Sequence, residues 1–84
     1  MSNPRETALK DLNFLLEDVC RDLGFCNRLL AADLLKTQSV LSAADFAAAV
    51  LHAEDMIPEH QPKWSRQLAE RFTARFGPAI RLPD

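Results

Sequence analysis

The chain has 84 residues, which is enough for one domain with a small hydrophobic core. An apolar content of 48% argues against a disordered chain, and the scarcity of glycine, tyrosine and β-branched residues favours helices over strands. The net charge of −2 does not by itself predict a nucleic-acid partner, but it is unevenly spread. Residues 1–60 carry five basic and ten acidic side chains, whereas residues 61–84 carry five and two.

The N-terminal segment carries charges of both signs and no apolar stretch, so it is not predicted to be a signal peptide. The longest purely apolar run, residues 46–51, is far shorter than the roughly 20 residues that span a bilayer. We therefore expect a soluble, cytoplasmic protein that makes no membrane contact and whose thiols are kept reduced.

The first helix is predicted over residues 4–23. Ser2 or Asn3 can cap its N-terminus, and Pro4 suits the first helical turn because its missing N–H needs no partner there. Gly24 is predicted to end the helix in the left-handed conformation, within a Schellman motif that places Cys20 under Phe25. One arc of the helix is apolar and is expected to face the core: Leu9, Leu12, Leu16, Val19, Cys20 and Leu23.

A short second helix is predicted over residues 27–36, with Asn27 as its cap. Its apolar surface comes from Leu29, Leu30, Leu34 and Leu35. Residues 37–41 are predicted to be a connector.

The third helix is predicted over residues 43–56. Ser42 can accept a hydrogen bond from the backbone amide of Asp45, whose carboxylate is favourable near the positive helix end. We expect Pro58 to end this helix, because the residue before a proline disfavours the helical conformation.

The fourth helix is predicted over residues 62–76, after a proline-bounded loop. Gly77 is expected to close it through a single hydrogen bond, because Pro78 has no N–H for a second one. The tail, residues 79–84, is apolar enough to lie against the helices. Together these elements predict an all-α fold, a compact irregular bundle of about four helices that forms a single helical domain over residues 1–84.

The two cysteines, Cys20 and Cys26, are the main candidates for chemistry. Their spacing is not that of a zinc site, and His52 and His60 lie in different kinds of segment, so no metal site is predicted. We favour reduced, packed thiols. A Cys20–Cys26 disulfide is feasible around a turn and would imply an oxidising compartment or a redox role.

No catalytic residues and no phosphate-binding glycine loop are recognisable, so we expect no enzyme and no cofactor. Cys26 is the only plausible reactive group, because it precedes a predicted helix N-terminus, whereas Cys20 lies near a helix C-terminus.

Four residues are candidate partner contacts: Phe14, Trp64, Arg71 and Arg75. Phe14 points about 140° away from Leu9 on its helix, so either a loop or the tail covers it, or it anchors a contact with another chain.

The fourth helix is basic, and Arg71 and Arg75 flank Trp64 on it. These arginines either contact nucleic-acid phosphates or pair with acidic residues of the first and third helices. The acidic excess in residues 1–60 favours internal pairing.

We therefore expect a small non-enzymatic protein-interaction or regulatory module that binds a protein partner or itself. The alternative is a nucleic-acid-binding protein that uses the fourth helix. It is the weaker hypothesis, because the link over residues 58–62 is longer and stiffer than a helix-turn-helix turn. A third hypothesis is a thiol-dependent redox function at Cys26.

Overall fold

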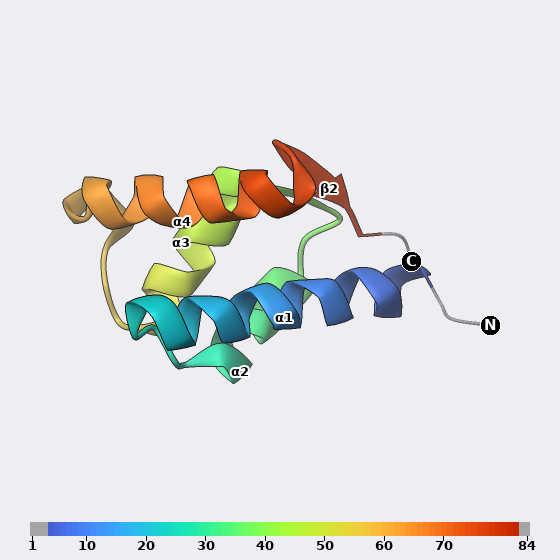
Figure 1. Ribbon diagram of the computed structural model, residues 1–84, viewed down its shortest axis with the longest axis horizontal. Helices are drawn as coiled ribbons and strands as arrows, with labels where there is room; N and C mark the ends of the chain where they lie inside the picture. Colours follow the sequence, from blue (N-terminus) through green and yellow to red (C-terminus); the bar gives the residue numbers. More distant parts are fainter. Residues whose placement is uncertain (1–3, 83–84) are drawn as a thin grey trace.

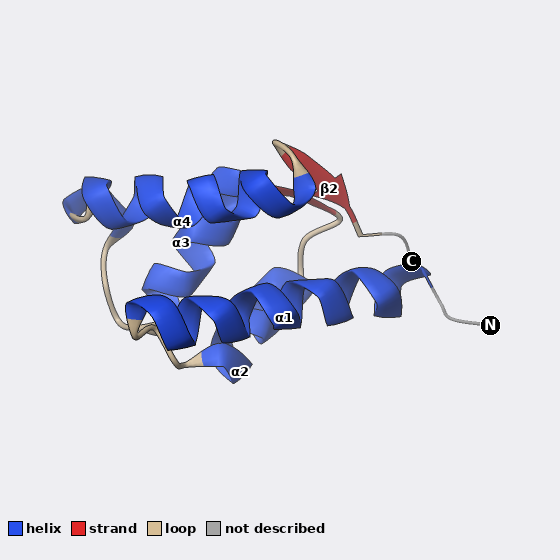
Figure 2. Ribbon diagram, in the orientation of Figure 1, coloured by secondary structure: helices blue, strands red, loops and turns tan. Residues whose placement is uncertain are grey.

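Four helices account for most of residues 4–82, which are the residues that the computed structural model describes. The fold is the all-α irregular bundle that the sequence predicts, with one small sheet that it does not predict (Figure 2). The predicted caps Ser2 and Asn3 lie outside the described residues. In chain order the elements are α1 Pro4–Leu23, α2 Arg28–Lys36, β1 Val40–Ser42, α3 Ala43–Ala53, the 3-10 turn η1 Pro58–His60, α4 Pro62–Phe76 and β2 Ala79–Arg81.

The two long helices, α1 and α4, lie side by side and run in opposite directions (Figure 1). Helix α3 packs against α4 and also against α2, and α2 packs against α1 at the edge of the molecule. The bundle encloses one hydrophobic core, whose largest fully buried side chains include Phe46 of α3 and Phe72 of α4. The described residues therefore pack around a single apolar cluster.

The turn between α1 and α2 is held by backbone and side-chain contacts. Gly24 has a φ of +84°, as predicted, but its N–H donates to the Cys20 carbonyl at 3.0 Å, which is the single αL-type bond and not the predicted Schellman motif. Asn27 does not cap α2 with its side chain, contrary to the prediction. Its side-chain amide donates instead to the Ala53 carbonyl at 2.6 Å, and its N–H donates to Glu54 Oε1 at 2.9 Å. Asn27 thus joins the start of α2 to the end of α3.

Helix α3 begins where the sequence predicts and ends three residues early. Ser42 and Asp45 form the expected capping box, with each side chain accepting from the other's backbone N–H at 3.1 Å. At the other end Asp55 is left-handed, with a φ of +62°. The N–H of Met56 donates to Leu51, and that of Asp55 to His52, which is a Schellman motif. Asp55 therefore ends the helix, and the prediction that Pro58 does so is wrong.

The connector and the tail pair as the two strands of an antiparallel sheet. Leu41 lies opposite Ile80, and the N–H of Leu82 extends the pairing by donating to the Ser39 carbonyl at 2.8 Å. Both leucines are buried, so the tail lies against the bundle as predicted. The predicted single hydrogen bond at the end of α4, from Gly77 to Thr73, is also present, at 2.8 Å.

Candidate functional site

Phe14 is exposed on α1. About 46% of its surface is accessible, so the interpretation that a loop or the tail covers it is wrong. Its position leaves it a candidate contact, surrounded by charged side chains of the same helix.

Trp64 is half-buried and lies at the edge of the core. Its ring meets the buried ring of Phe25 edge to face, with centroids 5.1 Å apart and planes at 87°. This geometry is favourable for aromatic pairs. Trp64 therefore helps to fix the α1–α2 turn against α4, which gives this predicted contact residue a structural role.

The arginines of α4 pair with α1. Arg71 Nη1 lies 2.8 Å from Asp22 Oδ2, and Arg75 Nη1 lies 3.9 Å from Asp18 Oδ2. Arg21 adds a second cation at 2.8 Å from Asp18. The hydrogen bond from Arg71 is the main cause that lowers the pKa of Asp22, and Arg21 adds to it. Internal pairing is thus confirmed for α1, whereas no ion pair among residues 4–82 joins α4 to α3.

Helix α2 exposes three of its four leucines. Leu29 is 84% exposed, Leu30 44% and Leu34 37%, whereas Ala31 and Leu35 are buried. We call Leu29, Leu30 and Leu34 the leucine face. At 100° per residue the four leucines of α2 span about 240° of the helix circumference, which is more than one packing contact can cover. That angular spread was the signal in the sequence for this surface.

A shallow groove of about 180 Å³ runs from the leucine face toward α3. Its floor is apolar, and acidic and polar groups stand at its edge. The residues that line it include Leu34, Leu35, Asp45, Ala48, Ala49 and His52. Residues 27–60, which form the α2 and α3 side of the molecule, carry two basic and five acidic side chains, a net charge of −3 with neutral histidines. This side of the molecule is therefore acidic on balance, although on α2 itself Asp33 pairs with Lys36, with Oδ1 and Nζ 3.4 Å apart.

The two cysteines form a disulfide, so the favoured hypothesis of reduced, packed thiols is wrong. The bond is possible because the turn at Gly24 brings the two Cα atoms to 4.4 Å. Cys26 is exposed and Cys20 is half-buried.

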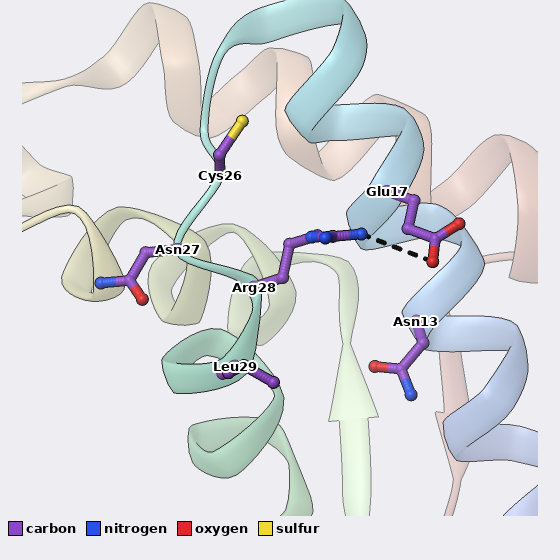
Figure 3. A pocket seen from close by; sticks show the side chains of 6 residues that line it. All are labelled: Asn13, Glu17, Cys26, Asn27, Arg28 and Leu29. Atoms are coloured by element: carbon purple, nitrogen blue, oxygen red, sulfur yellow. Dashed lines mark ion pairs between the residues drawn. The ribbon is translucent and has the colours of Figure 1, made fainter.

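A pocket of about 460 Å³ opens beside Cys26 (Figure 3). In it Arg28 extends toward Glu17 of α1, with Nη1 and Oε1 3.4 Å apart. The lining residues are Asn13, Glu17, Cys26, Asn27, Arg28 and Leu29. Cys26 and Leu29, which is one end of the leucine face, therefore both line this pocket.

Replacing both cysteines by serine is expected to lower the free energy of unfolding by about 2 kcal/mol, because the bond closes a loop of only seven residues. For a domain of this size the melting temperature should fall by roughly 10 °C. Circular dichroism melts check this, with a phosphine reductant as a control that shifts the native protein and leaves the double variant unchanged. A double variant that is unfolded at 25 °C would show instead that the bond is required for folding.

Within residues 4–82, no group of three or more His, Cys, Asp or Glu side chains is placed to hold a metal ion. In the same part of the chain no helix has the length and apolar character to cross a bilayer. Comparison with protein-family models, curated proteins and solved structures found no match to this chain.

Proposed function

We propose that this chain is a small, soluble, non-enzymatic module of the cytoplasm that binds another protein through the leucine face. The observation that carries the proposal is the exposure of Leu29, Leu30 and Leu34 on one short helix. A single exposed leucine is ordinary, but a cluster of them on a small domain marks an interaction surface. Leu30 and Leu34, one helical turn apart, have the spacing with which amphipathic helices bind partners.

The surroundings of the leucine face specify the chemistry of the partner. By helical geometry Asp33 lies between Leu29 and Leu30, and Asp45 stands at the edge of the neighbouring groove. A partner segment with apolar residues flanked by lysine or arginine complements this surface. We therefore propose an amphipathic helix with a basic border as the ligand.

A second copy of the chain fits this surface less well. Because Asp33 lies within the face, a two-fold contact through antiparallel α2 helices would bring the two Asp33 carboxylates close together, each balanced only by its own Lys36, 3.4 Å away. Like charges facing each other across an interface are destabilising. A different protein is therefore the proposed partner.

The test is a titration with two designed helical peptides that share one apolar stripe and differ in whether lysines or glutamates flank it. The basic peptide is expected to bind with a Kd of roughly 10 μM, because three leucines and a shallow groove make a small interface. The double variant Leu30→Glu/Leu34→Glu should weaken binding by at least about tenfold, since it buries two unpaired charges. Ile57→Glu, which places a charge at an exposed apolar site outside α2, is the matched control and should bind normally.

Equal binding of both peptides, or no effect of the double variant, would contradict the proposal. If sedimentation shows that the native protein is a dimer and that the double variant is a monomer, the leucine face binds a second copy of the chain.

Binding of duplex DNA that falls steeply with salt would favour the nucleic-acid alternative. The ion pairs of Arg71 and Arg75 with α1 weigh against it. Lys63 and Arg66 make no ion pair within the described part of the chain, so the variant Lys63→Ala/Arg66→Ala is the one that would remove such binding.

A further inference from the structure

We propose that the Cys20–Cys26 bond is a thiol–disulfide exchange site at which a low-molecular-weight thiol attacks the sulfur of Cys26. This goes beyond the binding function and does not depend on it. The bond joins the last turn of α1 to the residue two positions before α2. Cys26 is exposed and lines the pocket of about 460 Å³, whereas Cys20 is half-buried in its helix and is not among the lining residues.

Of the two cysteines, only Cys26 is among the residues that line the pocket. Pockets of 300–1,000 Å³ accommodate small molecules, and this one is within that range. Its polar side chains come from two helices, Asn13 and Glu17 from α1 and Arg28 from the first position of α2, and the Cys26 sulfur points away from them at one end of the pocket (Figure 3). A peptide-like thiol with both amide and charged groups would find hydrogen-bond partners on both walls.

The fold around the bond is held by contacts that do not involve sulfur. Gly24 donates to the Cys20 carbonyl, and Phe25 packs against Trp64. Asn27 is tied to Ala53 and Glu54 at the end of α3. These contacts keep positions 20 and 26 near each other when the bond is open. The bond can therefore open and close again within one folded state, which a reversible exchange requires.

The exchange balances as two thiol transfers. A thiolate, after losing its proton to solvent, attacks Cys26 Sγ and forms a mixed disulfide, while the Cys20–Cys26 bond breaks and Cys20 leaves as a thiolate that takes a proton from water. A second thiolate attacks the sulfur of the bound small thiol and releases Cys26. The net reaction reduces the protein disulfide to two thiols and oxidises two small thiols to their disulfide.

Electrostatics and access act on different steps of this reaction. A thiolate at position 26 lies two residues before α2, whose N-terminus stabilises negative charge, although its sulfur is also 3.5 Å from the Cys20 carbonyl oxygen of α1; a thiolate at position 20 lies within the last turn of α1, near a helix C-terminus. Leaving-group stability alone would thus favour attack on Cys20, but the burial of Cys20 inside α1 hinders that approach. In the reduced protein the more stable thiolate and the greater solvent access both belong to Cys26. Cys26 is therefore the nucleophile that begins reoxidation.

The test exposes the native oxidised protein to glutathione, quenches with acid, alkylates and maps the mixed disulfide by mass spectrometry. Glutathione is expected on Cys26 over Cys20 by at least about tenfold, and glutathione disulfide should restore the bond. In the single variants, Cys20→Ser leaves Cys26 free and should react with glutathione disulfide at least about ten times faster than Cys26→Ser does. The same reaction rates measured in urea give the reactivity of each thiol in the unfolded chain and serve as the control. Circular dichroism verifies that each variant is folded without urea.

Two outcomes would overturn the proposal. One is a native protein that stays oxidised at glutathione concentrations that reduce it in urea, because the bond would then be inaccessible in the fold. The other is a mixed disulfide found mainly on Cys20, which would place the point of attack on the half-buried sulfur.

Discussion

Phe72→Ala is expected to lower the free energy of unfolding by about 3–5 kcal/mol, the usual cost of deleting a buried phenylalanine. Phe72 is fully buried and lies between two other rings. Its centroid is 5.5 Å from that of Phe46 on α3 and 5.1 Å from that of Phe76 on α4. The substitution leaves a cavity between the two helices that share the most extensive contact in the bundle. For a domain of 84 residues this loss is a large part of a total stability of roughly 4–13 kcal/mol.

Urea unfolding followed by circular dichroism and by the fluorescence of Trp64, the single tryptophan, measures this effect. Phe14→Ala is the matched control, because it removes the same side chain from an exposed site and should change stability by less than about 0.5 kcal/mol. If the two variants lost the same stability, the assignment of Phe72 to the core and Phe14 to the surface would be wrong.

Leu82→Ala is expected to lower the free energy of unfolding by about 2–4 kcal/mol. Leu82 is only 2% exposed, and its N–H donates to the Ser39 carbonyl next to the sheet. The substitution therefore removes a core side chain and loosens β2 from β1.

The matched control for Leu82 is its neighbour Arg81, whose side chain is exposed while its backbone pairs with Val40. Arg81→Ala should cost less than about 0.5 kcal/mol in the same urea experiment. A small effect of Leu82→Ala, comparable to that of Arg81→Ala, would show that the tail does not belong to the core.

The helix ends that the sequence predicts are those with strong local signals. Gly24 and Gly77 have positive φ values, and Ser42 with Asp45 forms a capping box, so these boundaries follow from the residues themselves. The end of α3 cannot be predicted in this way, because the residue that ends it in a left-handed conformation is Asp55, and this conformation is normally adopted by glycine. A prediction from Pro58 therefore places the boundary too late.

The sheet was not predictable because it forms between two short segments that are far apart in the sequence. Each strand has three residues, and the partners Leu41 and Ile80 are 39 positions apart in the sequence. Three residues are too few to show the alternation that marks a strand. What the sequence does show is the apolar character of the tail, and this was enough to predict that the tail packs.

The site was predicted less well than the fold. Of the four candidate contacts, Phe14 is exposed, Trp64 packs on Phe25, and Arg71 and Arg75 pair with α1. The disulfide depends on how tightly the chain turns at Gly24, which the spacing of the cysteines does not specify. The leucine face was missed because the apolar surface of the second helix was not divided into a buried and an exposed part, although the angular spread of its leucines exceeds one face.

Helix α2 turns Leu29, Leu30 and Leu34 toward solvent, and of its four leucines only Leu35 is buried in the core. The most direct measurement is the broadening of leucine methyl signals in the nuclear magnetic resonance spectrum by a neutral, soluble paramagnetic probe. Strong broadening is expected for the leucine face, and little for Leu35 and Leu41. Equal protection of all four leucines of α2 would contradict the claim and remove the basis of the proposed binding function.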